Sequence, residues 1–135
     1  MLTTISIGKA IEFRVVSELL LRGHEVYLAT ADSGVDLILG NGKKLQVKGS
    51  NKGAKGHSHY ERYTFSFKTW HKRGKKYTTH ELEGVDFVIC WAIQDNLFYI
   101  IPAELIRGKY SVRVKPSSQS QSLLTPYQDK WELLS

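Results

Sequence analysis

Cysteine, proline and long apolar runs are all scarce in this chain. Its 135 residues include one cysteine, Cys90, and three prolines. A single cysteine excludes an intramolecular disulfide, and the apolar run around Cys90 predicts a buried packing residue. No apolar stretch is long enough to span a bilayer, and the pattern of a secretory signal is missing. We therefore expect a cytoplasmic protein that has no membrane partner.

Acidic residues are also in short supply. The chain has 13 Asp and Glu against 19 Lys and Arg, which gives a formal charge of +6. This excess of positive charge suits a polyanionic partner. With 41% hydrophobic residues and no internal repeat, a chain of 135 residues can bury one core without disulfides. We expect a single domain over residues 1–135.

Residues 35–50 carry the most informative pattern in the chain. Two short apolar runs flank Gly40-Asn41-Gly42, which predicts a β-hairpin. A two-residue loop would mix polar and apolar side chains on both faces, whereas a three-residue loop pairs Asp36 with Gln46. Because a slip of one residue moves every side chain to the other face, the hydrophobic pattern selects the three-residue loop. Gly42 then takes the left-handed position.

This register sorts the hairpin into an apolar face and a polar face. The apolar members are Val35, Leu37, Leu39, Leu45 and Val47. The polar members are Asp36, Gln46 and Lys48. The Asp36 carboxylate, the Gln46 amide oxygen and the Val47 backbone carbonyl are hard ligands of the kind that Mg²⁺ prefers. Lys48 can orient a water and stabilise charge on a phosphate. A buried structural pair of Asp36 with Lys48 is the alternative.

A helix is predicted over Ile7–Arg22, with Ser6 as N-cap and Gly23 just past its end. Glu12 lies on the apolar stripe of this helix, because the residues three, four, seven and eight positions later are Val15, Val16, Leu19 and Leu20. A carboxylate there costs free energy unless it finds a partner or a metal ion. The alternative is that Glu12 reaches solvent at the edge of the stripe or pairs with Lys48.

Asp36 followed by Gln46-Val47-Lys48 resembles the PD-(D/E)xK nuclease motif, and Glu12 stands on a helix at the right distance before it. The runs 8–13, 20–26 and 33–36 resemble the opening of Holliday-junction-resolvase-like and small homing-endonuclease-like members. Gln46 departs from the Asp or Glu of most members, but some intron-associated homing endonucleases carry Gln there. The motif is short, and the order of helix, hairpin and later strands makes the resemblance more specific.

The resemblance implies an α/β, restriction-endonuclease-like core, with a mixed β-sheet of four to six strands flanked by helices. It also implies a DNA endonuclease that depends on Mg²⁺, or Mn²⁺, and leaves 5′-phosphates. Glu12, Asp36, Gln46 and Lys48 are then the catalytic residues, and Glu12, Asp36, Gln46 and Val47 are the metal ligands. Cleaving two strands of double-stranded or branched DNA needs two sites, so we expect a homodimer or homotetramer.

Three other interpretations of the chain stay open. A Holliday-junction resolvase is the first. A catalytically weak or inactive DNA-binding module of the same fold is the second, since Gln46 removes one negative charge from the site. A small interaction domain unrelated to DNA is the third.

Two basic segments are candidate DNA contacts. The glycine-rich loop 51–59 leaves the hairpin directly after the predicted site, and Trp70–Lys76 is the densest positive cluster. A solvated surface is the alternative for both segments. The residues expected to contact nucleic acid are Lys9, Ser33, Lys52, Lys55, Lys72, Arg73, Lys75 and Lys76.

The later chain predicts further elements of the sheet. Tyr60–Lys68 alternates like a half-buried strand, and Val85–Ile93 with Leu97–Ile101 predicts a hairpin at the centre of the sheet. Asp86, inside the first of these runs, is expected to bond backbone amides.

The C-terminal part of the chain is expected to leave and rejoin the core. Residues 115–124 predict a flexible polar linker, which precedes a helix over residues 126–134. Pro126 suits the first turn of that helix. Trp131 and Leu134 are expected to dock it on the core.

Overall fold

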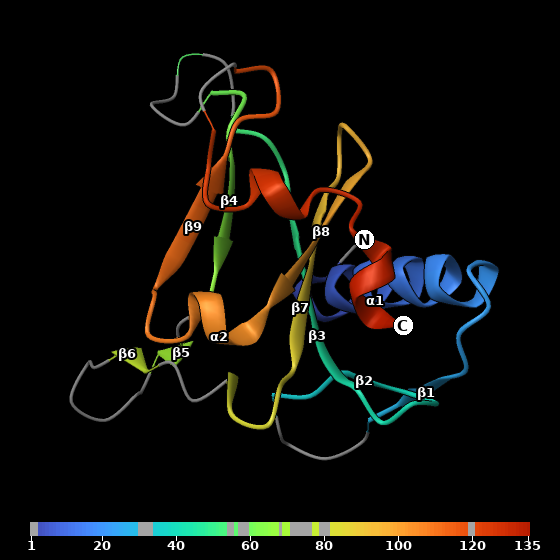
Figure 1. The fold of residues 1–135 in the computed structure, drawn as a ribbon. Helices are drawn as coiled ribbons and strands as arrows, with labels where there is room; N and C mark the ends of the chain where they lie inside the picture. The colour runs from blue at the N-terminus through green and yellow to red at the C-terminus, as the bar shows by residue number, and fades with distance from the viewer. Residues whose placement is uncertain are drawn as a thin grey trace.

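A five-stranded sheet forms the centre of the protein (Figure 1). The computed structural model describes residues 3–29, 34–53, 56, 60–67, 69–70, 77–78, 82–118 and 121–135. The strand order in the sheet is β1-β2-β3-β7-β8. These strands are β1 (Val26–Leu28), β2 (Leu37–Leu39), β3 (Lys44–Ser50), β7 (Phe87–Ala92) and β8 (Leu97–Pro102).

The sheet is mixed, as the sequence predicts. β3 pairs with β7 in parallel, and every other neighbouring pair in the sheet is antiparallel. The expectation that the β7–β8 hairpin occupies the centre of the sheet is wrong. β3 is the middle strand, because β7 inserts directly beside it and leaves β8 at the edge.

The C-terminal segment covers the outer edge of β8. Gln128 forms a bridge with Tyr99, and the Asp129 amide donates to the Phe98 carbonyl at 2.7 Å. The predicted helix over 126–134 is therefore wrong: the segment forms two short 3₁₀ helices, η2 (Thr125–Tyr127) and η3 (Trp131–Leu134). Asp129, with φ of 52°, separates them. The backbone groups of this segment hydrogen-bond to the open edge of β8, which prevents them from forming one continuous helix.

The first helix, α1 (Thr4–Leu21), starts three residues earlier than expected. Thr3 is its N-cap, because its hydroxyl accepts from the Ser6 amide at 3.0 Å, so the assignment of Ser6 as N-cap is wrong. The helix ends at Leu21, one residue before the predicted end at Arg22. Gly23 follows the helix with φ of 91°, a conformation that glycine adopts without steric cost.

Both faces of the sheet are buried, and each has its own core. α1 covers one face (Figure 1). The helix-side core comprises Val15, Leu19, Leu37, Leu39, Leu45, Ile89, Phe98, Ile100, Trp131 and Leu134. Trp131 and Leu134 are 5% and 0% exposed, which confirms them as anchors of the C-terminal segment.

The opposite face is covered by a second, two-stranded sheet and a short helix (Figure 1). These elements are β4 (Tyr63–Ser66), β9 (Ser111–Val114) and α2 (Ala103–Ile106). We call the β4–β9 pair the ribbon and the core beneath it the ribbon-side core. This core includes Val35, Tyr63, Phe65, Phe67, Val88, Cys90, Tyr99, Ile101, Ile106, Val112 and Val114. Cys90 is fully buried there, as predicted.

Val35 corrects one detail of the predicted hairpin. It packs in the ribbon-side core, not with Leu37 and Leu45 on the other face of the sheet. Val35 precedes β2, so the strand alternation that governs Leu37 no longer applies to it.

A third, two-stranded sheet joins β5 (Thr69–Trp70) and β6 (Tyr77–Thr78). The basic turn expected between them lies outside the described residues. In the part of the chain that the structure describes, no helix combines the length and apolarity needed to cross a bilayer.

Candidate active site

The predicted three-residue turn is present in the β2–β3 hairpin. The Leu39 amide donates to the Lys43 carbonyl at 2.9 Å, which closes the turn over residues 40–42. Gly42 has φ of 88°, as the turn requires. The Asn41 side chain accepts from the Lys43 amide at 3.1 Å and stiffens the turn.

This turn gives the hairpin the expected register. Leu37 lies opposite Leu45 and Ile38 opposite Lys44, so the same register continued beyond β2 would place Asp36 opposite Gln46. Because successive side chains on a strand alternate between faces, Gln46 and Lys48 share one face of β3. The observed loop length and strand register are those that the hydrophobic pattern selects, although Val35 lies on the other face of the sheet.

β2 and β3 separate just beyond this pair. The Asp36 amide still donates to the Leu45 carbonyl at 2.8 Å, but the Val47 amide donates to the Asp36 side chain, also at 2.8 Å. A strand residue directs its amide and its carbonyl to the same edge, so the Val47 carbonyl points into the same opening. We call this opening, bounded by Asp36, Gln46, Val47 and Lys48, the fork.

α1 approaches β3 closely just beyond the fork. Gly49 follows Lys48, and a Cβ added at Gly49 would lie 2.6 Å from Ile11 Cδ1. Only a residue without a side chain lets the helix lie this close to the strand. Glu12 follows Ile11 on α1, and its side chain is 13% exposed, with Oε1 3.5 Å from Lys9 Nζ.

Several charged groups influence the Asp36 carboxyl. Burial raises the pKa of Asp36 above its ordinary value, while the Val47 amide opposes this by bonding the charged form. The negative charge of Glu12 raises the Asp36 pKa further, and the positive charges of Lys48 and Lys9 lower it. The Glu12 charge thus acts on Asp36, and a cation bound beside Asp36 would relieve both its burial and this repulsion.

The ligand set available to a metal ion is partly neutral. Among the residues that the structure describes, no three His, Cys, Asp or Glu side chains are grouped to hold a metal. A metal ion at the fork would therefore need neutral oxygens, such as those of Gln46 and Val47, beside the carboxylates of Glu12 and Asp36. All of these are hard oxygen donors, which fit Mg²⁺ or Mn²⁺ better than softer metals.

Gln46 and Lys48 differ in how they lie on the strand. Gln46 is 4% exposed and sits beside Val88 of β7. Lys48 is half-buried beside Cys90, where burial raises the pKa of the thiol and the nearby Lys48 charge opposes that rise. Lys48 thus carries its positive charge close to the interior of the site.

The predicted DNA contacts are only partly described. Lys9 is 59% exposed and stands next to Glu12 at the site. Lys52 forms an ion pair with Asp95 at 3.2 Å, and its amide donates to Gln94. The remaining predicted contacts, Ser33, Lys55, Lys72, Arg73, Lys75 and Lys76, lie outside the described residues.

Asp86 has the structural role that the sequence suggests. Its carboxylate accepts from the Lys44 amide at 2.8 Å, and its own amide donates to the Lys44 carbonyl at 2.8 Å. It therefore ties the start of β7 to the start of β3, at the end of the strand away from the fork.

Sequence reasoning missed two features. The first is Gly49, for which the only signal is a glycine inside a strand, a known mark of close backbone approach. The second is the grouping of Arg62 with Arg113 and Lys115 at the β4–β9 ribbon; the alternation of residues 60–68 predicts only that Arg62 lies on a polar face that could follow a DNA backbone. Strand alternation places Arg62 and Arg113 on polar faces, but nothing local indicates that these two strands pair.

Comparison with known proteins defines the class to which this site belongs. A model of the PD-(D/E)XK endonuclease family matches residues 2–134, so the chain belongs to that family. A solved structure of a bacterial homing endonuclease, I-Ssp6803I, is similar, with a TM-score of 0.80 and 20% sequence identity over 98% of this chain and 93% of that chain. At this identity the likeness shows the fold, and it confirms the predicted α/β core. No curated protein matches the chain.

Proposed function

We propose that this protein is a divalent-metal-dependent DNA endonuclease of the homing-endonuclease-like type, with its active site at the fork. One observation carries the proposal. Asp36 is held by the Val47 amide at the point where β2 leaves β3, within electrostatic range of Glu12 and Lys48. Membership of the PD-(D/E)XK endonuclease family supports both the class of reaction and DNA as substrate.

The oxygen donors at the fork suit Mg²⁺, with Mn²⁺ as an alternative. Glu12 and Asp36 supply two negative charges, and the Gln46 amide and Val47 carbonyl supply neutral ligands. When bound, the ion supplies a water of lowered pKa and stabilises charge on the phosphate. Gln46 makes the site one charge less negative than an acidic residue would, so we expect weaker metal binding than in a site with three carboxylates.

The residues of the chain have distinct roles in the hydrolysis. The Val47 amide fixes the Asp36 carboxylate, and Glu12 completes the acidic pair from α1. Lys48 orients the attacking water and neutralises charge that develops on the phosphate oxygens. The water attacks phosphorus in line, the bond to the 3′-oxygen breaks, and the product carries a 5′-phosphate.

Cleavage of supercoiled plasmid tests this function. The wild-type protein is expected to cut in Mg²⁺ and not in EDTA, whereas Lys48→Ala is expected to lose cleavage and keep DNA binding. Equal and negligible cleavage by both proteins, with intact binding, would instead identify a DNA-binding module. The burial of Gln46 is the observation that keeps this second function open, because a residue 4% exposed can serve packing alone.

Gln46→Glu tests the ligand assignment separately. The added carboxylate is expected to tighten Mg²⁺ binding by about tenfold, since a third negative charge faces the ion. Isothermal titration with Mg²⁺ measures the change in the absence of DNA. An unchanged affinity would remove Gln46 from the ligand set.

The type of DNA target and the assembly are proposals of the same kind. Two strands require two active sites, so we propose a homodimer or homotetramer in solution, which light scattering measures. Cleavage of a random plasmid library, compared with synthetic four-way junctions, separates a site-specific enzyme from a junction resolvase.

A further inference from the structure

The outer face of the β4–β9 ribbon is strongly cationic. The inward side chains Tyr63, Phe65, Val112 and Val114 are buried against the main sheet. Thr64 pairs with Arg113, and Arg62 and Lys115 directly adjoin the last pair of the ribbon, Tyr63 with Val114. We call the surface formed by Arg62, Thr64, Arg113 and Lys115 the cationic ribbon face.

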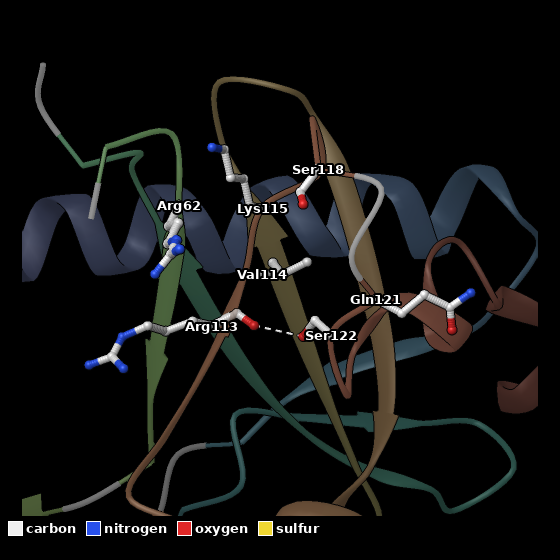
Figure 2. Close-up of a pocket in the computed structure, with 7 residues that line it drawn as sticks. All are labelled: Arg62, Arg113, Val114, Lys115, Ser118, Gln121 and Ser122. Atoms are coloured by element: carbon white, nitrogen blue, oxygen red, sulfur yellow. Dashed lines mark hydrogen bonds between the residues drawn. The ribbon is translucent and has the colours of Figure 1, made fainter. Parts of the chain in front are cut away.

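A cleft of about 280 Å³ lies at this face (Figure 2). Of the residues that the structure describes, three cations and no acidic residue line it: Arg62, Arg113, Val114, Lys115, Ser118, Gln121 and Ser122. Figure 2 shows the Arg113 side chain extending from β9 toward β4, on the side where Arg62 lies and away from Gln121 and Ser122. The Ser122 hydroxyl donates to the Arg113 carbonyl at 2.6 Å, which holds the far wall of the cleft against β9.

The three cations of this face, Arg62, Arg113 and Lys115, do not form ion pairs within the described part of the chain. The neighbouring acid Glu61 accepts instead from the Ser117 hydroxyl at 3.3 Å. By contrast, Arg14, Arg22 and Lys52 are all paired with carboxylates. The cationic ribbon face is therefore available to an external anion.

The cationic ribbon face also continues from the fork. The Thr64 amide donates to the Ser50 hydroxyl at 3.2 Å, which joins β4 to the end of β3. Ser50 is two residues after Lys48, a separation of roughly 7 Å along a strand. The Arg62 carbonyl accepts from the Gly53 amide at 3.0 Å, so Arg62 adjoins the segment that leaves the fork.

We propose that the cationic ribbon face binds the phosphate backbone of the same DNA duplex, beside the phosphate that is cut at the fork. This inference rests on the proposed function and adds to it a surface that positions the substrate. The charge of the face matches a polyanion, and arginine pairs with phosphate through two parallel hydrogen bonds. Contacts of this kind set the register of a duplex and do not read its sequence.

Duplex binding by Arg62→Ala/Arg113→Ala tests the proposal. Fluorescence anisotropy in EDTA, over a series of salt concentrations, measures affinity without cleavage. Loss of two phosphate contacts is expected to reduce the slope of log affinity against log salt by about 1.8 and to weaken binding about tenfold or more at low salt. Cleavage at saturating DNA is expected to keep its rate, with the loss confined to KM.

Lys44→Ala/Lys109→Ala is the matched control. It removes the same charge from exposed positions outside the ribbon cleft. The control is expected to change the salt slope by much less than the test variant. Equal slopes for the two double variants would overturn the proposal, because they would show only a general effect of net charge. Equal competition by a polyglutamate peptide and by unlabelled duplex would also overturn it, in favour of an acidic protein partner.

The proposal and the function on which it rests fail separately. In one outcome, the wild-type protein never cleaves DNA, but its slope of log DNA affinity against log salt depends on Arg62 and Arg113. This would contradict the catalytic assignment and support the cationic ribbon face as a DNA-binding surface. Cleavage that depends on Lys48, together with an unchanged salt slope in Arg62→Ala/Arg113→Ala, would do the reverse.

Discussion

Asp36 and Asp86 have similar local surroundings in sequence and in backbone hydrogen bonding. Each follows a valine, and each accepts a hydrogen bond of 2.8 Å from a backbone amide of β3. Asp86 bonds Lys44 at the start of the strand, and Asp36 bonds Val47 in its middle. The two carboxylates therefore perform the same structural task at two points of one strand.

Their surroundings make them different. Asp86 is exposed at the end of the sheet, whereas Asp36 is half-buried where β2 has left β3. There the charges of Glu12, Lys48 and Lys9 all act on it. The difference arises where β3 loses β2 as its neighbour. Because no strand covers this edge, charged side chains from other elements can act on Asp36 there.

The largest expected difference between the two aspartates is in cleavage. Asp36→Asn keeps an acceptor for the Val47 amide but removes a charged metal ligand, so we expect a loss of about 100-fold or more in kcat. Asp86→Asn is expected to stay within about twofold of wild type, because nothing places Asp86 at the fork. Plasmid cleavage in Mg²⁺ measures both. Similar losses in the two variants would break the distinction.

Gly49→Ala tests whether close helix packing builds the fork. The added Cβ would lie within 3.0 Å of three Ile11 atoms, so the helix must shift, at a cost of about 1–3 kcal/mol in unfolding free energy. We expect weaker Mg²⁺ binding as well, since Glu12 moves with Ile11. Urea unfolding and titration calorimetry measure the two effects.

Gly8→Ala and a double variant control that experiment. No atom lies within 4 Å of a Cβ at Gly8, so its replacement in α1 is expected to be neutral or to stabilise by up to about 1 kcal/mol. Gly49→Ala combined with Ile11→Ala is expected to recover much of the lost Mg²⁺ affinity. No recovery would show that Gly49 acts through its backbone and not through space for Ile11.

The stability of the fork depends on pH in a direction set by Asp36. Its pKa is raised in the folded protein, so the folded state retains a proton that the unfolded state has lost. Stability therefore falls as the pH rises from the unfolded pKa through the folded one. In EDTA, Asp36→Asn is expected to gain stability over wild type at about pH 7 and little at about pH 3. A constant difference at both pH values would contradict the buried charge.

The smallest expected effect concerns Asp86 alone. Asp86→Ala leaves the Lys44 amide without its carboxylate acceptor and is expected to cost about 1 kcal/mol of unfolding free energy. Asp86→Asn keeps an acceptor and is expected to cost less. Denaturant midpoints of the two variants, read with unchanged cleavage, would confirm a purely structural role.

Local pattern accounts for the parts of the site that were predicted. The apolar alternation around Gly40–Gly42 determines the hairpin register, which pairs Leu37 with Leu45. The helical stripe places Glu12 on the buried side of α1. Each of these depends on neighbours within a few residues or one turn, so a single sequence contains the information.

The sequence-based predictions that are wrong concern contacts between segments far apart in the chain. Residues 126–134 are predicted as a helix, but Gln128 pairs with the edge of β8, a strand that begins about thirty residues earlier. The central place expected for the β7–β8 hairpin yields to the parallel pairing of β3 with β7. Neither partner can be read from the local pattern, because strand propensity does not say which strand lies alongside.

By itself, the sequence determined the chemistry: which side chains carry charge, which face of helix or strand each occupies, and that Gly42 allows the three-residue turn. Only the tertiary structure decided that β2 leaves β3 at Asp36, that Gly49 admits α1, and that β4 pairs with β9 to gather Arg62, Arg113 and Lys115. The physical reason is that periodicity fixes the direction of a side chain within its own element, whereas the distance between elements depends on how their cores pack.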